Sequence, residues 1–164
     1  MQRRNFLLAA LVVSAISGCG TLAPSEYKEP QEGETATLVF SKDGHMLVIP
    51  NLYVGAAECT DRTRLPPLPD DGEVARKIIA GQPISFSLSR TENYLTNGCI
   101  STVTFTPEAN HRYIAQVKGH GATCNIDLSD AGKLGDEYAP PKSVPKTDRH
   151  WHRPLSEHGP FCTE

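Results

Sequence analysis

Residues 112–128, RYIAQVKGHGATCNIDL, decide the fold. Apolar and polar residues alternate on both sides of the turn Gly119-His120-Gly121. A period of two places successive side chains on opposite faces, which is typical of a half-buried strand. A short glycine-containing turn between two such runs joins antiparallel neighbours. The stretch therefore predicts a β-hairpin whose apolar face consists of Tyr113, Ala115, Val117, Ala122, Cys124, Ile126 and Leu128.

Two further runs of the same kind lie before this hairpin. Residues 84–89 alternate isoleucine, phenylalanine and leucine with serine, and residues 99–106 place Cys99, Val103 and Phe105 on one face. Short alternating strands at regular spacing, without a long amphipathic helix, are typical of an antiparallel sandwich. We therefore expect an all-β fold, a single antiparallel β-sandwich of about seven strands.

The first half of the domain is less regular. Residues 35–40 and 45–49 flank Asp43-Gly44, and this pair predicts a second hairpin because both residues tolerate the positive φ of a tight turn. Residues 56–71 contain three prolines and predict a long irregular loop. Residues 73–79 are too few for their period to distinguish a short helix from a strand.

The two ends of the chain lack a hydrophobic period. Residues 20–33 are polar and contain proline, so we expect a flexible tether. Residues 139–164 hold five prolines, which makes regular structure unexpected and leaves two alternatives, an extended strap pinned by Cys162 or a partly disordered tail. The expected organisation is a signal peptide at 1–18, a tether at 19–33, the sandwich at 34–138 and the strap or tail at 139–164.

The beginning of the chain has the pattern of an export signal. Arg3 and Arg4 precede a short, largely apolar run at 6–16, which ends in Ile16-Ser17-Gly18-Cys19. The run is shorter than the roughly 20 apolar residues that cross a bilayer. Ile-Ser-Gly-Cys resembles the bacterial lipobox, whose cysteine thiol receives a diacylglycerol and becomes the mature N-terminus. The alternative is a plain secretory signal with an incidental cysteine.

The resemblance to a lipobox implies a location. Two acyl chains on one residue hold a protein on a membrane, whereas a single chain gives only marginal binding. The residue after the cysteine is Gly20 rather than aspartate, which by similarity to the Gram-negative sorting pattern favours the outer membrane. We therefore expect an envelope lipoprotein that faces the periplasm and is attached to the membrane through Cys19.

A second resemblance involves residues 105–109, FTPEA, together with Tyr113. This stretch resembles a turn and strand in small bacterial lipoproteins with transthyretin-like or immunoglobulin-like sandwiches. Asn110 stands where that pattern usually has glycine. The group has no common activity, so the resemblance implies a fold and a location but no reaction.

Four cysteines remain after Cys19, and an even number in an exported domain predicts two disulfides with three possible connectivities. No C-x-x-C motif occurs, which argues against a redox centre or a zinc ribbon. Cys99 and Cys124 lie on the inward faces of their predicted strands, so we expect them to pair. Cys59 and Cys162 would then join the long loop to the C-terminal segment.

The remaining sequence offers little chemistry. The formal net charge is −3 and the charges are dispersed, which argues against nucleic acid as a partner. His150, His152 and His158 are candidate ligands for zinc, copper or nickel, but we expect Trp151 to pack on the sandwich and the histidines to be solvated. No G-x-S-x-G or phosphate-binding motif occurs.

The sequence thus predicts a non-enzymatic structural or protein-interaction module without a catalytic residue, bound metal or cofactor. The alternative is a metal- or small-ligand-binding lipoprotein that uses the tail from His150 to His158. A small hydrolase is a third reading, because the residues of a catalytic triad need only converge in space.

Overall fold

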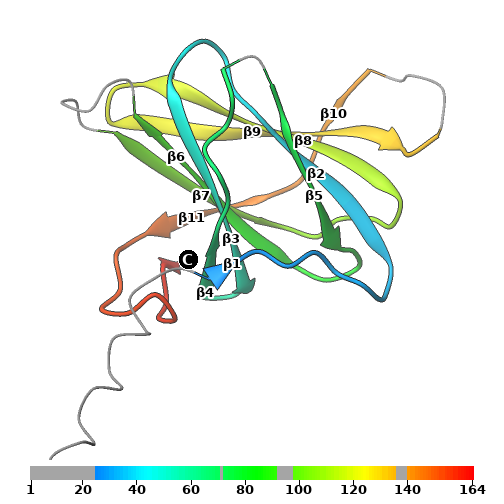
Figure 1. Ribbon diagram of the computed structural model, residues 1–164, viewed down its shortest axis with the longest axis horizontal. Helices are drawn as coiled ribbons and strands as arrows, with labels where there is room; N and C mark the ends of the chain where they lie inside the picture. Colours follow the sequence, from blue (N-terminus) through cyan, green and yellow to red (C-terminus); the bar gives the residue numbers. More distant parts are fainter. Residues whose placement is uncertain (1–24, 71, 92–97, 136–139) are drawn as a thin grey trace, which may run out of the picture.

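The computed structural model describes residues 25–70, 72–91, 98–135 and 140–164, and this part of the chain forms strands but no helix. Accordingly, no helix long and apolar enough to cross a membrane is found among these residues. Two sheets face each other across one hydrophobic core (Figure 1). In chain order the strands are β1 (Ser25–Glu26), β2 (Thr35–Ser41), β3 (Leu47–Gly55), β4 (Thr60–Arg64), β5 (Val74–Ile79), β6 (Ile84–Thr91), β7 (Cys99–Phe105), β8 (His111–His120), β9 (Thr123–Lys133), β10 (Lys142–Ser143), β11 (Thr147–Trp151) and β12 (Cys162–Thr163).

The described strands form a seven-stranded sheet, in the order β1-β4-β3-β6-β7-β11-β12, and a five-stranded sheet, in the order β10-β9-β8-β2-β5. β1 runs parallel to β4, and β2 runs parallel to β8. The predicted all-β class is confirmed. The finer expectation, one antiparallel sandwich of about seven strands, is wrong, because both sheets are mixed and the strands are more numerous. Short strands such as β1, β4 and β10 carry no apolar alternation, so periodicity could not reveal them.

The main core lies between the two sheets. Phe40 of β2 meets Phe86 of β6 edge to face, with ring centroids 5.6 Å apart. Phe105 of β7 and Tyr113 of β8 make the same kind of contact at 5.0 Å. These aromatic pairs join the two sheets, and edge-to-face packing adds to the stabilisation from burial alone.

A hairpin at residues 112–128 is confirmed, but the predicted turn Gly119-His120-Gly121 is displaced, because Gly119 and His120 belong to β8 and Ala122 lies in the turn. β8 and β9 pair antiparallel from His111↔Lys133 to His120↔Thr123, which leaves Gly121 and Ala122 as a two-residue turn. The segment at 73–79, which the sequence left ambiguous, is strand β5.

The second predicted hairpin is wrong. β2 pairs with β5 and β8 in one sheet, whereas β3 pairs with β4 and β6 in the other. Gly44 has a φ of 70°, so the turn signal reports the backbone conformation correctly. A turn of this kind does not determine whether the next strand stays in its sheet or crosses to the opposite one.

Two segments expected to be irregular contain strands. Within residues 56–71, β4 pairs with β3 from Gly55↔Thr60 to Asn51↔Arg64. Within residues 139–164, β11 pairs with β7, and its last two residues pair with β12. Proline has no N–H to donate to a ladder and would interrupt a strand from within. The prolines of both segments lie outside these strands, so the pairing is not interrupted.

Candidate functional site

The outer face of the seven-stranded sheet carries a second, smaller core. Tyr53 follows Leu52 in β3, so its side chain points away from the main core. The buried members are Tyr53, Cys59, Phe161 and Cys162, with Trp151 packed against them. Ring centroids of Phe161 lie 5.7 Å from Tyr53 and 6.5 Å from Trp151. Residues 152–162, here called the strap, therefore cover this face.

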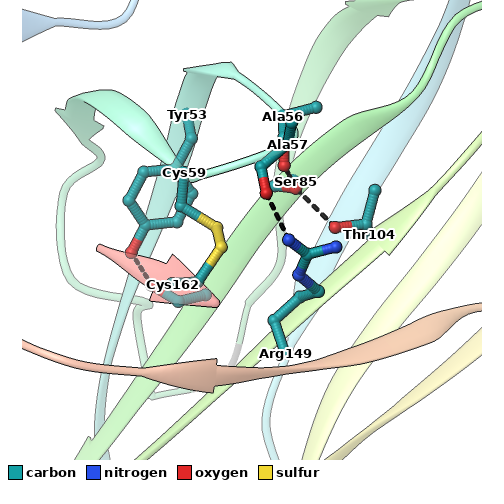
Figure 2. The surroundings of a disulfide bond; sticks show 9 residues. Tyr53, Ala56, Ala57, Cys59, Ser85, Thr104, Arg149 and Cys162 are labelled. Atoms are coloured by element: carbon teal, nitrogen blue, oxygen red, sulfur yellow. Dashed lines mark hydrogen bonds between the residues drawn. A yellow bond between two sulfur atoms is a disulfide. The ribbon is translucent and has the colours of Figure 1, made fainter. Parts of the chain in front are cut away.

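Covalent and ionic contacts fix the strap to β4 and to the turn before it. The disulfide between Cys59 and Cys162 joins them with a Cα–Cα distance of 5.4 Å (Figure 2). Arg62 donates from Nε to Glu157 Oε2 at 2.8 Å, and its guanidinium carbon lies 4.7 Å from the ring centroid of Phe161. Of the two alternatives for residues 139–164, the described part, residues 140–164, agrees with an extended segment pinned by Cys162.

A layer of polar side chains is buried beneath the strap. Ser87 Oγ lies 2.9 Å from the hydroxyl of Tyr53 and accepts from Asn51 Nδ2 at 3.3 Å. Ser85 Oγ contacts Thr104 Oγ1 at 2.6 Å (Figure 2). Burial raises the pKa of Tyr53. β6 is thus buried on both faces over most of its length, and Ser85 and Ser87 form hydrogen bonds instead of facing solvent.

The second disulfide joins the two sheets. Cys99 begins β7 and Cys124 lies in β9, and their Cα atoms are 5.9 Å apart. The structure thus contains the predicted pairing, Cys99–Cys124 with Cys59–Cys162. Cys19 lies outside the described residues, so lipidation there stays a prediction.

The three candidate metal-binding histidines occupy different settings. His150 is exposed in β11, and the backbone of His152 donates to Phe161. His158 Nδ1 lies 2.9 Å from Asp61 Oδ1. In the described part of the chain, no group of three or more His, Cys, Asp or Glu side chains is arranged to hold a metal ion. Trp151 packs beside Phe161, in agreement with its predicted role.

Part of the expected flexible tether is docked on the sandwich. Ser25 and Glu26 form β1, and the hydroxyl of Tyr27 donates to the carbonyl of Lys77 in β5 at 2.5 Å. Burial, followed by the negative charge of Glu29, raises the pKa of Tyr27 to about 12. The backbone N–H of Lys77 in turn donates to Glu29 Oε1 at 3.4 Å. The segment therefore covers the free edge of β5.

An apolar cleft opens beside this docked segment, at the end of the sandwich where β3, β5 and β7 finish and β6 begins. Its volume is about 750 Å³. Its apolar walls include Tyr27, Leu52, Val54, Ile78, Ile79 and Ile84. The volume lies within the range of about 300–1,000 Å³ that is typical of small-molecule sites. Val54 is 75% exposed, so at least one wall of the cleft faces solvent.

The charged side chains that line the cleft in the described part of the chain are positive. Among the described residues that line it, Lys28 and Arg149 are charged and none is acidic. Arg149 donates from Nη2 to the carbonyl of Ala57 (Figure 2), whereas its Nε is buried without a hydrogen-bond partner. Arg149 pairs with Thr102 in the β7–β11 ladder, which fixes its backbone beside the cleft.

A second cleft, of about 650 Å³, lies near the turn before β8 and is more polar. Beside it, His111 Nδ1 lies 2.8 Å from Asp130 Oδ2, and His111 Nε2 lies 3.5 Å from Glu108 Oε2. The hydroxyl of Tyr113 accepts from the Glu108 backbone at 2.8 Å, and burial raises its pKa. These contacts connect the turn to β8 and β9, and they resemble the tyrosine corner of immunoglobulin-like sandwiches.

Sequence reasoning did not find the apolar cleft or Arg149. The cleft is formed by the ends of strands from both sheets and by the docked segment, and no local pattern encodes that combination. No family model, curated protein or solved structure matches this chain.

Proposed function

We propose that this chain is a lipid-anchored protein of the cell envelope, attached to the outer membrane through diacylated Cys19 and facing the periplasm. Its sandwich acts as a non-enzymatic interaction module. The observation that carries the proposal is that all four cysteines after Cys19 are paired in disulfides. Stable disulfides are typical of exported domains and rare in reducing compartments. The export signal and the lipobox resemblance at Ile16-Ser17-Gly18-Cys19 agree with this compartment.

The position of β1 supports a short connection to the membrane. An extended peptide from Cys19 to Ser25 reaches at most roughly 20 Å. Because Ser25 already pairs with β4, the domain would be held close to the bilayer. The side that contains β1 and the docked segment would then face the membrane.

The side-chain partners of two histidines bear on the hydrolase alternative. His111 and His158 both contact carboxylates. Within the described ranges, no hydroxyl or thiol is hydrogen-bonded to a histidine side chain, so a nucleophile with its base is not assembled there. The contacts of His111 serve to hold the turn before β8.

Membrane fractionation of intact cells tests the proposal. The wild-type protein should sediment with the outer membrane, and Cys19→Ala should lose that association. Gly20→Asp keeps the lipidated cysteine but changes the sorting residue, so this variant should move to the inner membrane. Recovery of Cys19→Ala in the outer membrane in wild-type amount would contradict anchoring through this residue.

A further inference from the structure

We infer that the apolar cleft beside the docked segment binds a long-chain fatty-acid anion, with the alkyl chain between Leu52, Ile79 and Ile84 and the carboxylate on Arg149. The inference goes beyond the proposed anchor, since it concerns a free ligand of the folded domain. It rests on the chemistry of the cleft walls and does not depend on acylation of Cys19.

The walls of the cleft supply the apolar part of the site. Apolar side chains from both sheets line this opening: Leu52 of β3, Ile78 and Ile79 of β5, and Ile84 of β6. Covering this apolar surface with an alkyl chain is favourable, because each methylene group that becomes buried raises the affinity of the ligand about fourfold. A chain without branches or polar atoms suits walls that offer few hydrogen-bonding groups.

Arg149 supplies the polar part. Its guanidinium is held by the carbonyl of Ala57, and its buried Nε lacks a partner. Arg149 also lines the cleft, and a carboxylate is the acceptor that fits a planar guanidinium best. Lys28 adds a second cation, and the described lining offers no acidic side chain that would neutralise either of them. The charge of the cleft therefore complements an anion.

The docked segment disfavours a peptide as the occupant. A bound peptide strand would need the free edge of β5, where backbone groups could pair with it. The hydroxyl of Tyr27 donates to the carbonyl of Lys77, and the backbone N–H of Lys77 donates to Glu29, so both groups already have partners. With that edge covered, the surface that remains is a cleft lined by side chains, with one cationic region. These features fit a ligand that has one alkyl chain and one anionic group.

The direct test is ligand binding by the full chain carrying Cys19→Ser, which removes its own acyl chains. The fluorescent probe is 11-(dansylamino)undecanoate, displaced by octanoate, laurate, palmitate or the uncharged hexadecanol. Displacement should strengthen from octanoate to laurate, and palmitate should compete at least about tenfold better than hexadecanol, because a charged hydrogen bond contributes that much. Equal competition by palmitate and hexadecanol, or no binding of the probe, would overturn the inference.

Two variants assign the roles of the cleft residues. Arg149→Gln should weaken palmitate about tenfold and leave hexadecanol unchanged, while Arg153→Gln, at an exposed arginine of the strap, should change neither. Val54→Glu places a negative charge at the exposed mouth without disturbing the core and should abolish palmitate binding. Equal losses for palmitate and hexadecanol in Arg149→Gln would reveal a structural role and refute the carboxylate contact.

The wild-type, lipidated protein provides the last comparison. It should bind the probe as the Cys19→Ser variant does. If only the Cys19→Ser variant binds, the anchor's own acyl chain fills the cleft and a free fatty acid is the wrong occupant. Fractionation reports on the anchor by itself, so failure of the anchor and failure of the ligand site are distinguished.

Discussion

Asn110 holds a backbone conformation that most side chains disfavour. Its φ is 62°, in the left-handed region, where glycine is free of strain and asparagine is tolerated. Its N–H donates to the carbonyl of Thr35, and its own carbonyl accepts from Leu134. The residue thus connects the turn before β8 to β2 and to the segment after β9. Glycine would adopt this conformation without strain.

The effect of replacing Asn110 on the free energy of unfolding should depend on whether the new residue tolerates this φ, and not on the loss of a side-chain contact. We expect Asn110→Gly to keep the unfolding free energy within about 1 kcal/mol of wild type. Asn110→Val should lower it by about 2 kcal/mol, because a β-branched residue is strained at this φ. Urea denaturation measures both. At Asn125, in extended β9, the valine variant should be more stable than the glycine variant, since valine suits a strand. Equal stability of the two Asn110 variants would contradict the role given to this φ.

Trp151 and its neighbouring histidines should differ in their effect on stability. Trp151→Ala removes a partly buried ring from Phe161 and should lower the unfolding free energy by about 2 kcal/mol. His150→Ala with His152→Ala should be nearly silent, and zinc should not change the melting temperature of either variant. A zinc-dependent rise in the wild type that disappears in the double histidine variant would instead favour the metal-binding alternative.

The strap is the element on which the outer core depends. It spans the polar layer of β6 and is held by a disulfide and by the Arg62–Glu157 ion pair. The sequence separation of the two bridged cysteines is 103 for Cys59–Cys162 and 25 for Cys99–Cys124. In the chain-entropy description these loops contribute about 4.7 and about 3.5 kcal/mol, respectively.

Removing each disulfide should therefore have a different result. Cys59→Ala with Cys162→Ala should lower the unfolding free energy more than Cys99→Ala with Cys124→Ala, and it should also release the strap. Limited proteolysis should then cut between residues 152 and 160 in the first variant and spare that segment in the second. A strap that stays resistant without its disulfide would contradict the role assigned to this bond.

The docked segment is a second element with a measurable signature. The pKa of Tyr27 rises from 10.0 to about 12 in the folded state, so folding favours the neutral hydroxyl. Its contribution to stability is complete below pH 10 and is lost as the pH rises toward 12. The hydroxyl form is also the one that donates to Lys77.

Denaturation at alkaline pH tests this contact. Between pH 10 and about 12, Tyr27→Phe should lose less stability than the wild type. Some loss should remain, because burial also raises the pKa of Tyr53 and Tyr113. Identical pH profiles of the two proteins would show that Tyr27 is not docked in solution.

At the scale of the whole molecule, the sequence predicted the strands that alternate and missed the features that depend on distant segments. The alternation at residues 112–128 identified β8 and β9, and the inward cysteines indicated the correct disulfides. The sheet crossing after β2 was missed because Asp43-Gly44 permits either outcome. The cleft and Arg149 were missed because the ends of strands from both sheets, β11 and the docked segment meet only in the folded chain.

The proposed attachment of the disulfide-stabilised sandwich to a membrane depends on Cys19. The decisive measurement is metabolic labelling of intact cells with an alkyne analogue of palmitate, followed by mass spectrometry of the mature N-terminal peptide. We expect label in the wild type, a mature chain that begins at diacylated Cys19, and neither in Cys19→Ala. Label of equal strength in Cys19→Ala, or a mature N-terminus at another residue, would contradict the account.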